Sequence, residues 1–244
     1  MRYEKVTAVV LGSRPLGEAD RIVTLFTREL GRADAVVKGV RRTKSRWGAR
    51  LEPFGVVDLV LFRGRSLYTV TSAQFVAMFP RLREDREAMI GAALLCEAVA
   101  GLFGEAEPEE RAFNLVVRAL RGLDEGFVGP AQRAPLVLGA LIKLLYEAGY
   151  LPVLDRCVAC GAGSRAVAFS AARGGLLCEN CLGEGVPITP EAVAALRHAL
   201  TAPLAELRTE GPSEAVEEGL RHLHSLYAYH TGQHLRALRY ARSA

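Results

Sequence analysis

The sequence contains two short cysteine motifs, Cys157-Val158-Ala159-Cys160 and Cys178-Glu179-Asn180-Cys181, separated by residues 161–177. This spacing is typical of a structural zinc site. Each Cys-x-x-Cys turn directs two thiolates toward one point, so two turns supply the four sulfur ligands of a tetrahedral Zn²⁺. Four sulfurs would leave the metal no open coordination position. We therefore predict one zinc ion per chain, with a structural and not a catalytic role.

The residues between the two motifs predict a small ribbon at 155–185. Two short strands are expected at 166–169 and 175–177, joined by a turn at Arg173-Gly174. The alternative for the four cysteines is a pair of disulfides, but nothing in the sequence suggests secretion, where disulfides are common. The fifth cysteine, Cys96, lies inside an apolar helical pattern and is expected to be a buried thiol.

Composition places the chain among globular proteins. Half of its 244 residues are apolar and 24% are charged. No stretch reaches the roughly 18 consecutive apolar residues of a membrane span, and residues 1–5 lack the apolar core of a signal peptide. With reduced cysteines, these features predict a cytoplasmic protein that does not associate with membranes.

Residues 1–80 have the pattern of a small all-β domain. Five apolar, β-branched segments are separated by turn signals such as Pro15-Leu16-Gly17 and Arg63-Gly64-Arg65. Five short strands in some eighty residues favour a closed barrel, because closure removes exposed sheet edges. An OB-fold is the preferred interpretation, and an SH3-like barrel is the alternative.

Residues 81–244 change to a helical pattern. Apolar residues recur at helical spacing from Arg83 to Gly104, from Pro108 onward, from Ala131 to Gly149, from Pro190 to Leu200 and from Ser213 onward. The segment ending at Gly149 is apolar on most sides and is expected to be the central helix of a bundle. The sequence therefore predicts a multidomain α+β protein, in which an α-helical bundle domain contains the inserted zinc ribbon.

Positive charge is concentrated in the first 80 residues. They carry 14 Lys/Arg and 7 Asp/Glu, a net of +7, whereas the rest carries 17 and 20, a net of −3. Residues 38–50 contain six basic residues and no acid: Lys38, Arg41, Arg42, Lys44, Arg46 and Arg50. Such a segment could be a solvated loop, but on a barrel of this class it is better explained as a nucleic-acid contact.

Trp47, the only tryptophan in the chain, lies within this basic segment. It could stack on a base, or it could equally fill one end of the barrel, and the sequence does not distinguish the two. We include it among the candidate DNA-binding residues. Sequence motifs of common enzymes are absent: there is no P-loop, no Gly-x-Ser-x-Gly elbow and no His-Glu-x-x-His. We therefore do not expect an enzyme.

Several motifs together resemble the bacterial RecO family of DNA repair proteins. They occur in the family's order over nearly the whole chain: Gly17-Glu18-Ala19-Asp20, Lys38-Gly39-Val40-Arg41-Arg42, Leu51-Glu52-Pro53-Phe54, and Gly149-Tyr150-Leu151-Pro152 before Cys157. The resemblance implies an N-terminal OB-fold, a helical C-terminal domain and a zinc ribbon within it. Some family members lack the four cysteines, so the resemblance implies that the zinc is not required for activity.

The resemblance also implies a function, that of a recombination mediator at the nucleoid. RecO proteins bind single- and double-stranded DNA and anneal complementary strands. They act with RecR to load RecA onto strands coated by single-strand-binding protein. The acidic, apolar tail of that protein would need a groove with a basic rim, for which Arg133 and Lys143 in the central helix are candidates. Two other functions remain open: an RNA-binding OB-fold protein with a structural zinc ribbon, and a metalloenzyme acting on nucleic acid.

Overall fold

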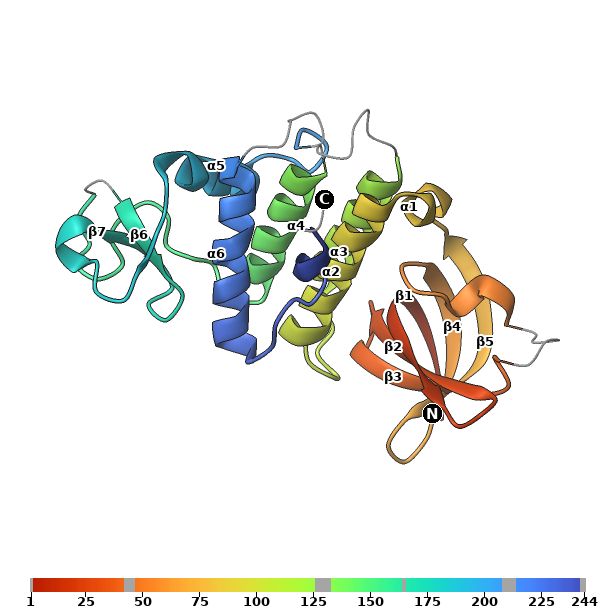
Figure 1. The fold of residues 1–244 in the computed structure, drawn as a ribbon. Coiled ribbons are helices and arrows are strands. Elements are labelled where there is room, and N and C mark those ends of the chain that lie inside the picture. The colour runs from red at the N-terminus through yellow and green to blue at the C-terminus, as the bar shows by residue number, and fades with distance from the viewer. Residues whose placement is uncertain (1, 42–46, 126–132, 164–165, 208–213, 242–244) are drawn as a thin grey trace.

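The computed structural model describes residues 2–41, 47–125, 133–163, 166–207 and 214–241. The chain begins with a closed five-stranded barrel, which continues into a group of helices that carries a small three-stranded sheet at its far side (Figure 1). The predicted barrel followed by a helical region is confirmed. The barrel strands are β1 (Tyr3–Leu16), β2 (Asp20–Thr27), β3 (Gly31–Val37), β4 (Val56–Arg63) and β5 (Tyr68–Ala77).

The strands close in the order β1-β2-β3-β5-β4, and the first half of β1 pairs with β4 while its second half pairs with β2. All pairings are antiparallel except that of β3 with β5, which is parallel. This is the strand arrangement of an OB-fold. The long β1 can serve two partners because its register shifts between Val10 and Gly12, which bends the strand. A short 3-10 helix, η1 (Gly48–Leu51), lies between β3 and β4.

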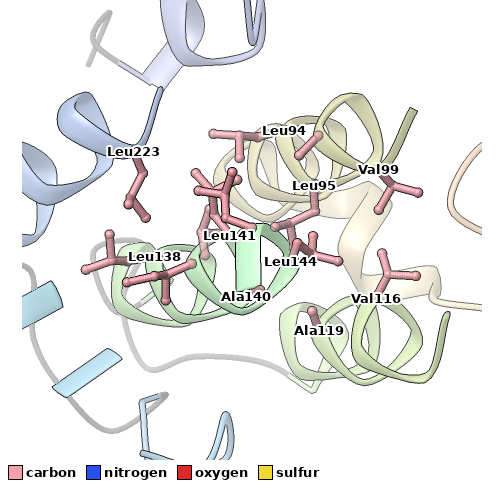
Figure 2. Packing of buried hydrophobic residues seen from close by; sticks show 14 of the residues in the cluster. Leu94, Leu95, Val99, Val116, Ala119, Leu138, Ala140, Leu141, Leu144 and Leu223 are labelled. Atoms are coloured by element: carbon pink, nitrogen blue, oxygen red, sulfur yellow. The ribbon is translucent and has the colours of Figure 1, made fainter. Parts of the chain in front are cut away.

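The helical region is built around α4 (Ala134–Glu147), as the sequence predicts. Ten of its residues are buried, and it contacts α2 (Arg86–Leu102), α3 (Glu110–Asp124), α5 (Pro190–Thr201) and α6 (Glu214–Thr231). In Figure 2, Leu138 of α4 lies toward Leu223 of α6, while Leu141 and Leu144 lie toward α2. Two short helices, α1 (Pro80–Glu84) and α7 (Leu238–Ala241), complete the region.

The ribbon contains the two predicted strands, β6 (Ala166–Ser170) and β7 (Gly175–Cys178), and a third short strand, β8 (Val186–Pro187). Its sheet order is β7-β6-β8. Backbone hydrogen bonds between Val153 and residues Gly174 and Leu176 join the ribbon to the segment that follows α4. The second cysteine motif begins at Cys178, the last residue of β7, and continues through a one-turn 3-10 helix, η3 (Glu179–Cys181).

The outer surface of the barrel packs against the helices at one end. Phe26 of β2 lies 5.3 Å from Phe103 and 6.2 Å from Phe113 between ring centroids. Gly31 begins β3 beside residues 104–107, and the N–H of Arg32 donates to the carbonyl of Gly104 at 3.1 Å. The two parts of the chain therefore share a hydrophobic core as well as backbone hydrogen bonds.

Gly31 provides a test of this junction. Its φ is +68°, and an added Cβ would lie 2.4 Å from the carbonyl oxygen of Glu107. Gly17 also has a positive φ, +59°, but has open space around it. Gly17→Ala should cost about 1–2 kcal/mol from backbone strain alone, and Gly31→Ala about 1–3 kcal/mol more because the junction must shift. Chemical denaturation measures the free energy of unfolding of both variants. Equal decreases in the free energy of unfolding would show that the chain around Glu107 shifts to accommodate the added Cβ of residue 31 without cost.

Candidate functional site

The four predicted metal ligands converge at one point of the ribbon. The Sγ atoms of Cys157, Cys160, Cys178 and Cys181 all lie within 4.8 Å of one another, although the motifs are far apart in sequence. The first motif turns back at Gly161, whose φ is +75° and whose N–H donates to the carbonyl of Cys157 at 2.8 Å. The N–H of Val158 in the first motif donates to the carbonyl of Leu176 in β7 at 2.8 Å, which holds the first motif beside the strand that ends at Cys178.

The geometry fits a tetrahedral metal. Zinc–sulfur bonds of about 2.3 Å in a tetrahedron place the sulfurs about 3.8 Å apart, and the Sγ atoms of Cys160 and Cys178 are 3.8 Å apart. That separation is too long for a disulfide, and all five cysteines are free thiols. The cluster could therefore hold a metal ion.

The electrostatics of the thiols also favour a cation. Hydrogen bonds from backbone N–H groups, first that of Cys178, lower the pKa of the Cys157 thiol to about 6. Hydrogen bonding with the sulfurs of Cys160 and Cys178, together with burial, raises the pKa of Cys181 to about 12. The cluster thus stabilises a thiolate at Cys157 and disfavours a second one at Cys181, to which repulsion by the charged Cys157 also contributes. A bound divalent cation would offset that repulsion and hold all four as thiolates.

The basic segment begins where β3 ends. Lys38 and Arg41 are exposed, and the backbone and side chain of Arg41 donate hydrogen bonds to the carbonyls of Ala19 and Gly17, in the turn between β1 and β2. Arg50, in η1, has its guanidinium 5.9 Å from the ring centroid of Phe75. Arg42, Lys44 and Arg46 lie outside the described residues.

The sequence left two roles open for Trp47, stacking on a base or filling one end of the barrel. In the structure, Trp47 is buried in the barrel. It is 4% exposed, packs with the barrel core, and its indole N–H donates to the carbonyl of Lys38 at 2.9 Å. This hydrogen bond ties the two ends of the basic segment together. Stacking on a base would require the indole to leave the core, so the described conformation favours a structural role for Trp47.

A groove of about 920 Å³ lies between α3, α4 and the chain that follows α5. Its apolar lining includes Leu115, Leu136, Leu200 and Leu204. Arg118 and Arg121 of α3 line one wall, and Lys143 of α4 also borders the groove. Arg111 and two acids, Glu125 and Glu147, also line the groove, so it combines an apolar floor with a rim in which basic side chains outnumber acidic ones.

The two candidate rim residues of the central helix differ in position. Burial lowers the pKa of the Lys143 ammonium, which donates to the carbonyls of Ala199 and Ala202 at the end of α5. Arg133 is 6% exposed, is not part of the groove lining, and pairs with Asp85 at 2.6 Å before α2. Arg133 thus joins two helix starts in this conformation, and its predicted partner contact stays a prediction.

Sequence reasoning missed Arg118 and Arg121, which border the groove. Their spacing of three residues on the strongly amphipathic α3 places both on its polar face, and this signal was present in the sequence. It did not distinguish them from ordinary solvated arginines. Only the structure shows that this face of α3 borders an apolar groove, whose lining also includes the end of α5 and the chain that follows it.

Two family models match the barrel and the helical region of the chain, in that order. The family model of the recombination protein O N-terminal domain matches residues 1–79, and that of the C-terminal domain matches residues 83–239. The chain belongs to the RecO family of DNA repair proteins. A DNA repair protein RecO of Rubrobacter xylanophilus is 37% identical, covering 91% of this chain and 89% of that protein. One of Cutibacterium acnes is 36% identical, covering 95% of both.

Membership of the RecO family confirms the resemblance of the sequence motifs. The join between the two family models falls at α1, where the barrel ends and the helices begin. Among the described residues, no helix is long and apolar enough to cross a membrane.

Removing one ligand tests the metal site of this RecO family member. Cys178→Ser should abolish most metal binding and loosen the ribbon, because a neutral hydroxyl is a poorer ligand than a thiolate. Cys96→Ala is the matched control, since Cys96 is buried in the helical core away from the ribbon. Elemental analysis and thiol titration measure the outcome. A parent protein with no metal and two disulfides would contradict the prediction.

Proposed function

We propose that this RecO family member is a recombination mediator. It binds single- and double-stranded DNA and anneals complementary strands. With RecR, it helps to load RecA onto strands coated by single-strand-binding protein at the nucleoid. The observation that carries this proposal is family membership over both parts of the chain, joined with a barrel of OB topology. The relatives' shared name, DNA repair protein, gives the process but none of these steps.

Annealing by this chain would depend on charge and not on a catalytic residue. A basic surface neutralises phosphates and lets two like-charged strands approach, without reading sequence. The barrel domain, residues 1–80, would supply this surface through Lys38, Arg41, Arg42, Lys44, Arg46 and Arg50. The exposure of Lys38 and Arg41 beside the turn between β1 and β2 supports the proposal.

The helical domain, residues 81–244, would capture a protein partner. Its groove has the chemistry for an acidic, apolar peptide: the apolar floor would hold side chains, and Arg118, Arg121 and Lys143 would attract carboxylates. The tail of single-strand-binding protein is such a peptide. The ribbon at residues 155–185 would bind one Zn²⁺ through its four thiolates, and that ion would stabilise the ribbon without entering the reaction.

Charge removal tests the proposed DNA surface. Replacing Arg41, Arg42 and Lys44 together by Ala should weaken binding to any sequence and impair annealing. The log–log salt slope on single strands should fall by about 0.7 for each phosphate that is no longer neutralised. The matched control replaces three exposed arginines of the other domain, Arg156, Arg173 and Arg221. Fluorescence anisotropy across a salt series measures binding. A variant that binds and anneals like the parent at every salt concentration would place the DNA-binding surface elsewhere.

The same titration distinguishes the second candidate function, an RNA-binding protein. A mediator of DNA recombination should bind single-stranded DNA at least as tightly as RNA of the same sequence. Markedly tighter binding to RNA would favour the alternative.

The groove is tested by Arg118→Ala combined with Arg121→Ala. Removal of two charged rim residues should weaken binding of a peptide with the acidic, apolar tail sequence about two- to thirtyfold, because exposed ion pairs each contribute about 0.2–1 kcal/mol. Arg156→Ala combined with Arg173→Ala is the control. Isothermal titration calorimetry measures the affinity. An unchanged affinity in the groove variant would exclude these arginines from the peptide site.

A further inference from the structure

The wall of the barrel is open between β3 and β5. These strands run parallel but pair only at Ala35 with Tyr68 and at Val36 with Thr69, near the end of β3 and the start of β5. β5 therefore continues past β3 on the side where residues 38–50 begin, and the short helix η1 contacts β5 there (Figure 1). Among the described residues, no strand pairs with this edge of β5 after Thr69.

Phe75 of β5 lies at this opening. Its register partner on β4 is Val57, whose side chain is in the barrel core, so the two side chains share the inner face of the wall. Val57 is fully buried, whereas Phe75 is 41% exposed. An inward-facing aromatic side chain is exposed to this extent where the wall does not close over it. The ring of Phe75 is thus accessible to a ligand.

A β-bulge lies directly beside Phe75. Ala77 opposes Val56 and Phe75 opposes Val57, so β5 has one extra residue, Val76, at this point. A bulge bends its strand and redirects the side chains next to it, and bulges are frequent beside functional sites. The direction of β5 therefore changes at the place where the ring becomes exposed.

Arg50 connects Phe75 to the basic segment. Its guanidinium lies 5.9 Å from the ring centroid of Phe75, and the same side chain donates to the carbonyl of Trp47 at 3.4 Å. The indole N–H of Trp47 in turn donates to the carbonyl of Lys38. An exposed ring therefore adjoins the last basic residue of residues 38–50, and the first basic residue is tied to the same place. Proteins that bind single strands combine aromatic rings with cations in this way.

Phe75 has the exposure that Trp47 lacks. Trp47 is 4% exposed and packs in the barrel core, so a base does not reach its ring in this conformation. Phe75 is the exposed aromatic residue that lies beside η1. The other exposed aromatic residues that the structure describes are Tyr3 at the start of β1 and Tyr146, Tyr229 and Tyr240 in the helical region.

The acids on the neighbouring elements are engaged elsewhere. Glu52, which follows η1, pairs with Arg21 at 3.2 Å. Asp58 is the register partner of Gln74, on the outer face of the wall, where it accepts a hydrogen bond from the Thr7 hydroxyl at 2.7 Å. The charge of Glu52 is thus offset by Arg21, and that of Asp58 lies on the opposite face from Phe75.

We propose that Phe75 is a base-stacking residue that gives the barrel a preference for single-stranded over double-stranded DNA. A base of a single strand stacks on the exposed ring, while Arg50 contacts an adjoining phosphate. In a duplex the bases are already stacked on one another and do not reach the ring, so only the charge contacts remain. This inference rests on the proposed DNA-binding function and deepens it, because it names a residue that distinguishes the two forms of DNA.

Stacking and charge can be tested separately. Phe75→Ala should lower the affinity for an oligothymidine about fivefold or more and leave the affinity for a duplex unchanged. Its log–log salt slope should equal that of the parent, because no phosphate contact is lost. Arg50→Ala should instead weaken binding to both forms and lower the slope on single strands by about 0.7. Fluorescence anisotropy across a salt series measures both effects.

A tryptophan introduced at position 75 reports stacking directly. Phe75→Trp should bind the oligothymidine at least as tightly as the parent, because tryptophan offers a larger ring. Its fluorescence should be quenched by the oligothymidine, and less by the same strand with abasic positions. The parent is the blank for this measurement, since Trp47 is buried and should show little quenching.

Controls keep the test decisive. Tyr240→Ala removes a tyrosine that is 62% exposed in α7 and should bind like the parent. If Phe75→Ala lowers the melting temperature, Phe75→Leu retains an apolar side chain without the aromatic face and should show the same loss on single strands. Phe75 variants that bind single strands like the parent, or that lose as much affinity for the duplex, would overturn this inference alone. A parent that binds no DNA would overturn the proposed function as well.

Discussion

The contact of Phe26 with Phe103 and Phe113 is the interaction on which the arrangement of this protein depends. A five-stranded barrel has a small interior, and here that interior is filled by side chains of its own strands and by Trp47. Apolar residues on the outside, such as Phe26 and Val9, need another cover, because exposing them costs about 25 cal/mol per Å². The helices supply that cover, so the barrel is attached at one end only.

Because the helices cover only one side of the barrel, its basic side chains fall into two groups, those at the junction and those exposed elsewhere. Near the helices, Arg28 lies 4.9 Å from the ring centroid of Phe113, and Arg32 donates to the carbonyl of Ala100 at 3.1 Å. These arginines stabilise the junction and cannot also serve a ligand. The exposed cations lie elsewhere, at Lys38 and Arg41 after β3 and at the turn after β4. An excess of positive charge counted over residues 1–80 therefore overstates the charge that is available to a ligand.

Local pattern predicted the elements well, because each depends on neighbouring residues. Alternating apolar residues gave the five strands, helical spacing gave the central helix ending at Gly149, and the spacing of the four cysteines gave a cluster whose Sγ atoms meet within 4.8 Å. The third ribbon strand, β8, escaped prediction because Val186-Pro187 is too short to show a period. Its strand character comes from pairing with β6 and not from its own sequence.

The site was less predictable, because it depends on which side chains are already engaged. Tryptophan and arginine are residue types that often contact ligands. Here, however, Trp47 lies in the barrel core and Arg133 pairs with Asp85. Residues that are distant in the sequence determine whether a side chain is already buried or paired. A short stretch of sequence does not contain these partners. Burying an arginine requires a paired acid, because an unpaired buried charge costs several kcal/mol, and Asp85 also caps α2 through the N–H of Ala88. Aspartate at that position thus fixes a helix start and holds Arg133 in the interior, which leaves ligand contacts to arginines that have no such partner.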